Sequence, residues 1–179
     1  MTQTQEQLVE QARQGSIDSF GKLYEQYYNG IVALAYSTLG EMGLAEDAAQ
    51  ETFAIACRDL MRLRDNSKFG SWLAGICRNI SRQMMKKEQK LIEVRDRQYV
   101  TDNNEISEVG QVIKEAVRLL RPKYREPIVL RYYDNLSYEK ISNILCISQV
   151  AVNGRILRAK QKIARQLKSV GVTEVDYGV

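Results

Sequence analysis

Residues 136–167, with the sequence LSYEKISNILCISQVAVNGRILRAKQKIARQL, decide the fold of the second half of the chain. Apolar residues recur along them at steps of three and four, which predicts helices. Ser137 and Ser148 stand where N-caps are expected, and Cys146 with Ile147 forms a short turn between two helices. The arrangement predicts a helix-turn-helix, a motif whose second helix enters the major groove of DNA.

The same periodicity divides these two helices into an inner and an outer face. We expect an apolar inner face made of Ile141, Ile144, Leu145, Val150, Val152, Ile156, Leu157 and Ile163. The candidates for DNA contact are Ser148, Gln149, Asn153, Arg155, Arg158 and Lys162. Arginine can pair with guanine, and glutamine or asparagine with adenine. A helical hairpin whose basic face is only solvated is the alternative.

The composition of the whole chain is that of an all-α globular protein. Of its 179 residues 44% are hydrophobic and 27% are charged, so the chain is too apolar to be disordered. It has no histidine, and its three cysteines are far apart. We therefore expect no metal site, no cofactor and no catalytic residue, and we expect each cysteine to be a reduced core residue. The polar N-terminus and the lack of a run of roughly 18 apolar residues predict a cytoplasmic protein without membrane insertion.

Charge is sorted into blocks along the chain. Residues 41–51 carry four acids and no base, whereas residues 149–168 carry six bases and no acid. The net charge of the whole chain is only +4. Blocks of one sign indicate surfaces that meet partners of the opposite sign.

The first half of the chain predicts a separate helical domain. Its apolar periodicity favours helices over residues 5–14, 20–39, 44–63 and 69–90. Asp18 or Ser19 is the expected cap of the second of these helices. We predict a first domain at 1–91, a flexible linker at 92–107, a helix-turn-helix domain at 108–170 and a tail at 171–179. In the second domain, Pro127 should bend or restart the helix that Pro122 opens.

An acidic patch in the first half is a candidate binding surface. Its members are Glu46, Asp47, Gln50 and Glu51. Because no nucleophile or histidine accompanies them, these side chains favour docking on a basic partner over catalysis. A solvated helix start, where acids complement the helix dipole, is the alternative.

A basic patch follows it. A polar loop made of Asp65, Asn66, Ser67 and Lys68 precedes a helix that carries Arg78, Asn79, Arg82 and Lys86. Basic grooves with neighbouring polar groups bind single-stranded nucleic acid, although a charge run can also be a solvated face. Trp72 shares the helical phase of Phe69 and Leu73, so we expect it in the core and not as a platform for stacked bases.

Taken in order, these motifs resemble the extracytoplasmic-function (ECF) sigma factors of the sigma-70 family, which are specificity subunits of bacterial RNA polymerase. The resemblance covers about residues 8–170. It rests on Gly15 to Phe20 with Leu23-Tyr24, Leu39-Gly40, Ala45-Glu46-Asp47 with Gln50-Glu51-Thr52-Phe53, Phe69 with Trp72-Leu73 and Arg78-Asn79, Leu120 with Pro122, Tyr124-Arg125 and Leu130-Arg131-Tyr132, and the helix-turn-helix.

The resemblance implies two helical domains joined by a linker and a role for each surface. The acidic residues match the segment that docks on the clamp helices of the largest polymerase subunit. Residues 65–68 and Asn79 match the reader of the minus-10 promoter element, beside which Arg78, Arg82 and Lys86 would hold phosphates while the strands separate. The outer face of the last helix matches the reader of the minus-35 element. The flap of the second-largest subunit and an anti-sigma factor are the other partners that the resemblance implies.

The chain departs from the family pattern in several places. Ala151-Val152-Asn153-Gly154 replaces a threonine-valine pair followed by a base and a serine, and Arg82-Gln83-Met84-Met85 replaces an Asp-x-x-Arg pattern. Ser142 stands for an alanine and Cys146 for the glycine of the turn. These changes leave the predicted fold intact and make the minus-35 sequence unpredictable.

Other functions fit part of the sequence. A stand-alone helix-turn-helix regulator explains the second domain but gives the acidic and basic patches of the first no common purpose. An enzyme with an appended helix-turn-helix is opposed by the lack of histidine and of a glycine-rich phosphate loop. A protein-binding adaptor would need no base contacts, so Arg155→Ala and Asn79→Ala would then be silent.

Overall fold

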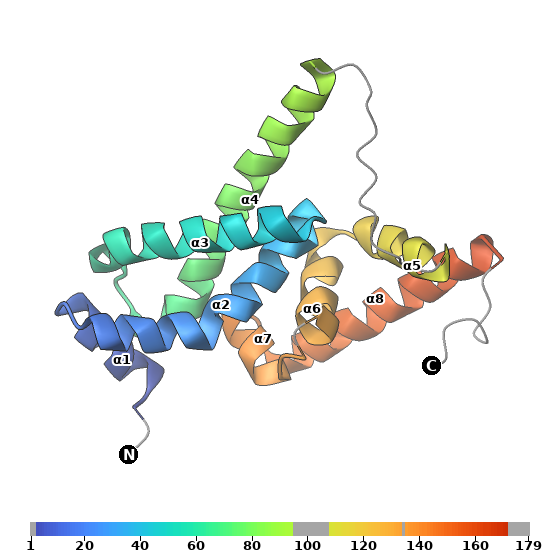
Figure 1. Cartoon of the computed structure of the whole chain (residues 1–179). Helices are drawn as coiled ribbons and strands as arrows, with labels where there is room; N and C mark the ends of the chain where they lie inside the picture. Colours follow the sequence, from blue (N-terminus) through green and yellow to red (C-terminus); the bar gives the residue numbers. More distant parts are fainter. Residues whose placement is uncertain (1–2, 95–107, 134, 172–179) are drawn as a thin grey trace.

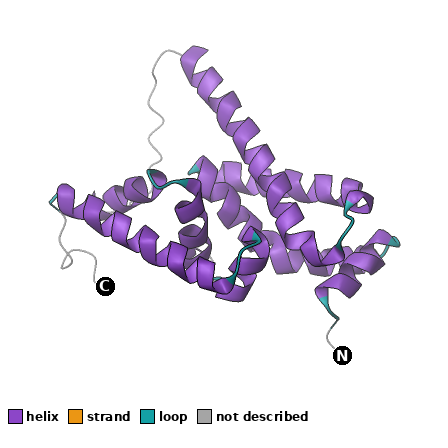
Figure 2. Ribbon diagram, turned by 180° about the vertical axis from the view of Figure 1, so that it is seen from behind, coloured by secondary structure: helices purple, strands orange, loops and turns teal. Residues whose placement is uncertain are grey.

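The computed structural model describes residues 3–94, 108–133 and 135–171, without the side chains of 90–94 and 108. All regular structure in these ranges is helical (Figure 2), which confirms the all-α prediction. The predicted linker and tail lie outside the described residues, apart from the last residues of the fourth helix and Gly171.

The first domain contains four helices (Figure 1). They are α1 (Gln5–Arg13), α2 (Ile17–Leu39), α3 (Met42–Asp59) and α4 (Phe69–Val94), with short 3-10 helices at Leu60–Arg62 and Asn66–Lys68 before α4. Helix α2 lies at the centre and packs on the other three. The side of α3 that faces α2 is lined with alanines, and Ala45, Ala48 and Ala49 are fully buried. Such small side chains let two helices approach closely, which leaves the longer polar side chains of α3 on its outer face.

The second domain contains α5 (Glu108–Arg118), α6 (Pro122–Tyr133), α7 (Tyr138–Leu145) and α8 (Gln149–Ser169). The predicted caps are confirmed, because Ser137 accepts a hydrogen bond from the Lys140 amide and Ser148 one from the Ala151 amide, each 3.2 Å long. Cys146 ends α7 in the left-handed conformation, with φ 54°. Together α7, this turn and α8 form the predicted helix-turn-helix.

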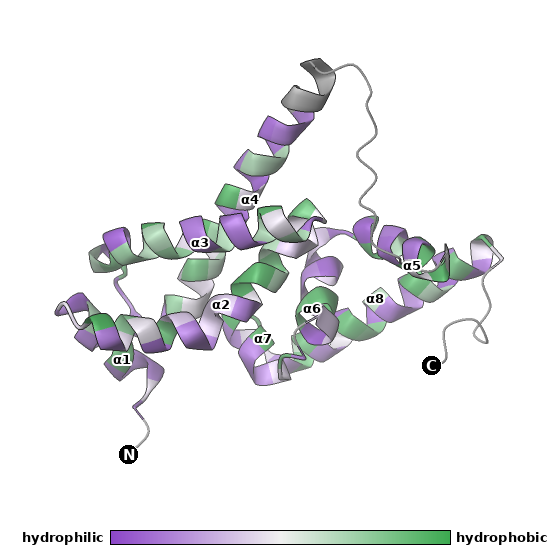
Figure 3. Cartoon of the chain, viewed as in Figure 1, coloured by the Kyte–Doolittle hydropathy of each residue, from purple (hydrophilic) through white to green (hydrophobic). Residues whose placement is uncertain are grey.

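The two domains pack against each other and share one apolar core. Helix α6 lies on α2, and α7 lies on α4. The rings of Tyr36 in α2 and Tyr133 in α6 stack with their centroids 5.0 Å apart. Green apolar faces are visible on the helices of both domains in Figure 3, whereas the part of α4 that extends beyond the bundle is mostly hydrophilic as far as its side chains are described.

Several local predictions are wrong, each for a local reason. Helix α2 begins at Ile17, three residues earlier than expected. Its cap is Ser16, not Asp18 or Ser19, because the Ser16 hydroxyl accepts a hydrogen bond from the Ser19 amide. Pro127 lies inside a continuous α6, where its buried ring packs into the core. Val150 and Leu157 are 83% and 56% exposed, because the buried stripe of α8 runs through other positions, Val152, Ile156, Ala159 and Leu167.

The cysteine and tryptophan predictions have mixed outcomes. Cys77 is a buried core residue, but Cys57 and Cys146 are exposed, so the core prediction was wrong for two of the three. Burial raises the pKa of the Cys77 thiol to about 11, which keeps it protonated and unreactive. Trp72 is half-buried and packs on the core beside Phe69, with ring centroids 6.1 Å apart.

Candidate nucleic-acid interface

The outer side of α8 forms the reading face, defined here as Gln149, Asn153, Arg155, Arg158 and Lys162. Arg155 is half-buried and the other four are exposed. None of its cations is paired with a carboxylate within the described residues, although Lys162 lies over the Tyr124 ring at 5.6 Å. Ser148 caps the helix with its hydroxyl. This face can donate to bases and phosphates without first breaking an internal ion pair.

The sequence prediction missed Val150 as part of this face. It lies in the first turn of α8 and projects into solvent. An exposed apolar side chain beside candidate base-contacting groups is suited to the methyl group of thymine. The sequence signal that could have placed Val150 on this face was its helical phase, which differs by one residue from that of the buried stripe of α8.

The acidic face consists of Glu46, Asp47, Gln50 and Glu51, and all four side chains are exposed on α3. They lie on the side of the helix opposite the buried alanines. Within the described residues, no ion pair links any of these acids to a cation of the chain. The structure therefore leaves this negative surface open to a basic partner.

The polar loop, Asp65–Lys68, is strongly hydrogen-bonded. Asp65 accepts hydrogen bonds from the backbone amide of Ser67 at 3.0 Å and from its hydroxyl at 2.6 Å, and these bonds lower the pKa of the carboxyl group. Lys68 lies 3.4 Å from Asp65 in an ion pair. Ser67 and Lys68 stay exposed, whereas Asn66 is half-buried against α1.

The basic stripe, Arg78, Arg82 and Lys86, runs along α4 beyond the polar loop. Arg78 forms a two-pronged ion pair with Glu126 of α6, with distances of 3.1 and 2.9 Å. Arg82 donates to the Asn79 side chain and to the Arg78 carbonyl, both at 3.0 Å. Lys86 is exposed. The structure thus brings the predicted residues onto one side of α4 but ties the first of them to the other domain, a partner that the sequence did not reveal.

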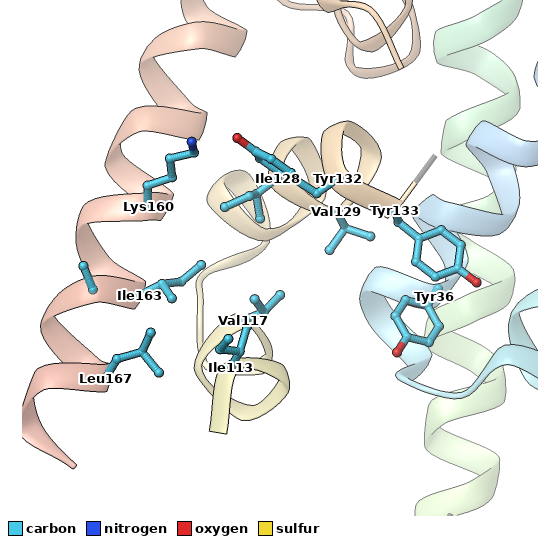
Figure 4. Close-up of a pocket in the computed structure, with 11 residues that line it drawn as sticks. Tyr36, Ile113, Val117, Ile128, Val129, Tyr132, Tyr133, Lys160, Ile163 and Leu167 are labelled. Atoms are coloured by element: carbon cyan, nitrogen blue, oxygen red, sulfur yellow. The ribbon is translucent and has the colours of Figure 1, made fainter. Parts of the chain in front are cut away.

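A large apolar groove lies in the second domain. Its volume is 630 Å³, and Figure 4 shows side chains from α5, α6 and α8 pointing into it, among them Ile113, Val129 and Ile163. Tyr36 of the first domain and Tyr133 stand at its edge. Such a concave apolar surface can bury a helical segment of another protein. The sequence prediction missed it because the groove depends on how α5, α6 and α8 pack against one another.

Other kinds of site find no support in the described part of the chain. No group of three or more histidine, cysteine or acidic residues there could hold a metal ion. No helix there is long and apolar enough to cross a bilayer.

Comparison with known proteins assigns these surfaces to one family. Residues 23–91 match the family model "Sigma-70 region 2", and residues 110–163 match "Sigma-70, region 4". The chain is 30% identical to the ECF RNA polymerase sigma factor SigW of Bacillus subtilis, with 90% of this chain and 96% of SigW covered. The chain belongs to the ECF sigma factors of the sigma-70 family. Region 2 contains α3 with the acidic face, the polar loop and the basic stripe, and region 4 contains the helix-turn-helix.

Two further comparisons extend over nearly the whole chain. It is 30% identical to the ECF sigma factor BldN of Streptomyces coelicolor over 90% of its own length, and it spans 65% of the length of BldN. The solved structure of CnrH in complex with the cytosolic domain of CnrY covers 92% of this chain, with a TM-score of 0.61 and 25% identity, and 97% of that chain is covered. These matches confirm the family resemblance that the sequence motifs indicated.

Proposed function

We propose that this ECF sigma factor docks on core RNA polymerase through the acidic face and directs initiation through two separate DNA contacts. The observation that carries the proposal is the sorting of charge onto separate, differently placed surfaces. The acidic face is open on α3, and the reading face is open on α8 of the other domain. Two weak DNA contacts held on one large partner gain affinity through their high effective concentration.

In this proposal the region 4 reading face recognises the minus-35 element in the major groove. Asn153, Arg155 and Arg158 would contact bases or phosphates, and Val150 a thymine methyl group. The polar loop and Asn79 would read the minus-10 element, while the basic stripe would hold phosphates of the separated strands. The apolar groove of region 4 would receive an apolar segment of the flap of the second-largest polymerase subunit.

The remaining parts of the proposal concern location and control. The chain would act in the cytoplasm, without chemistry of its own, because polymerase supplies the catalysis. An anti-sigma factor would restrain it. The capture of CnrH with the cytosolic domain of a second protein supports control by a protein partner.

Run-off transcription with purified bacterial core polymerase tests the proposal. We expect discrete start sites only when the chain is added, and we expect Asp47→Lys to abolish them by reversing charge at the centre of the acidic face. Glu25→Lys, an exposed acid of α2 outside that face, is the matched control and should remain active. Tight binding of palindromic duplex DNA without start sites would instead establish a stand-alone regulator.

A further inference from the structure

Three residues of helix α1 form hydrogen bonds with the polar loop, and the predicted function assigns no role to these bonds. The side-chain amide of Gln5 donates to the backbone carbonyls of Asn66 and Ser67, each at 3.3 Å. Asn66 donates to Glu10 at 3.1 Å, and Arg13 donates to the Asn66 side-chain oxygen at 3.4 Å. Both polar ends of the Asn66 side chain are therefore bonded to α1.

Gln5 is itself held from the core. The Tyr27 hydroxyl donates to the Gln5 side-chain oxygen, which turns the amide nitrogen toward the loop. Burial raises the pKa of Tyr27 to about 12, so its hydroxyl keeps its proton and remains a donor. The Tyr27 ring packs edge-on against Phe69, with centroids 5.5 Å apart. A chain of contacts thus runs from the core to the carbonyls of the polar loop.

From these contacts we infer that Gln5 and Glu10 are positioning residues that fix the polar loop for minus-10 recognition, and that Asn66 anchors the loop to α1. In this arrangement the exposed residues of the loop, Ser67 and Lys68, make the contacts with bases. The inference rests on the proposed sigma function. It differs from the sequence prediction, which treated all four loop residues alike.

A double-mutant cycle between Glu10→Ala and Asn66→Ala tests the anchor. The readout is the rate of promoter melting by holoenzyme, followed by 2-aminopurine fluorescence in the minus-10 element. Each single variant should slow melting by about tenfold, the typical loss for a hydrogen bond to a charged group, and the double variant should be no slower than either. Glu6→Ala, an exposed acid of the same helix, should be silent.

The outcomes separate the two claims. Additive losses, or full activity of Glu10→Ala, would overturn the anchor while wild-type transcription still supports the sigma function. Equal losses in the binding of core polymerase and in promoter melting would also overturn it. A positioning residue should leave the affinity for core polymerase unchanged. Absence of wild-type start sites would count against the sigma function itself.

Discussion

The two proposed DNA-binding surfaces use the same residue types but differ in how far those residues are already bonded to other parts of the chain. On the reading face of α8, no arginine or lysine is paired with an acid within the described residues, and four of the five side chains are exposed. On the region 2 surface, Arg78 is bonded to Glu126, Arg82 to Asn79 and Asn66 to α1. The comparison teaches that a basic helix predicts a binding surface without predicting whether that surface is free.

The largest expected effect comes from the core under the reading face. Ile156 is 3% exposed and Leu157 is 56% exposed, although the sequence pattern placed both inside. Ile156→Ala should lower the free energy of unfolding by about 2–5 kcal/mol, the usual range for a buried aliphatic truncation, and Leu157→Ala by far less. Urea unfolding followed by circular dichroism measures both, and similar losses would contradict the helical phase of α8.

Substitution of one arginine on each surface sharpens the comparison. Arg158→Ala should weaken binding of minus-35 duplex by about 1–3 kcal/mol and relax base preference at one position. Arg82→Ala should weaken single-strand binding nearly uniformly across sequences and reduce the salt dependence by about one unit of slope. Fluorescence anisotropy at several salt concentrations distinguishes them. A sequence-specific loss in Arg82→Ala would reverse the roles assigned to the two surfaces.

Substitution of glycine at the turn of the helix-turn-helix should change the stability of the protein by a smaller amount. The sign of this change should be opposite to that of a control substitution inside a helix. Cys146 adopts φ 54°, a conformation that costs a non-glycine residue roughly 1–2 kcal/mol. Cys146→Gly should therefore stabilise the protein by about 1 kcal/mol. Cys57→Gly places glycine inside α3 and should destabilise it by about the same amount. Thermal or urea unfolding that moves both variants in one direction would contradict the strained turn.

The smallest expected effect is the pH response of the region 2 surface. Hydrogen bonds from Asn66 and Gln14 lower the pKa of Glu10 below its ordinary value. A lowered folded-state pKa means that the contribution of Glu10 is present above the ordinary pKa and is lost as pH falls through the lowered one. The side-chain amide signals of Asn66 should titrate in this acidic window by NMR, and Glu10→Gln should abolish the transition. Movement of the same signals in Glu10→Gln would assign the titration to another group.

The sequence predicted much of this molecule because much of it is local. Caps, turn and helical periodicity identified both serine caps and the helix-turn-helix, since a cap depends on residues three apart. The same periodicity wrongly placed Val150 and Leu157 on the inner face. Where apolar residues stand at neighbouring positions, the sequence defines the buried side of a helix only loosely. Pro127 was misjudged because burial of its ring in the core outweighs the hydrogen bond that proline removes.

By itself, the sequence determined the helices, the charge blocks and the family, because periodicity and charge order survive any rearrangement of the helices in space. Only the tertiary structure decided which charged groups are engaged. The Arg78–Glu126 ion pair and the hydrogen bonds from α1 to the polar loop join residues 48 to 62 positions apart. Contacts of that range depend on how helices pack, and packing is set by the shapes of many side chains together.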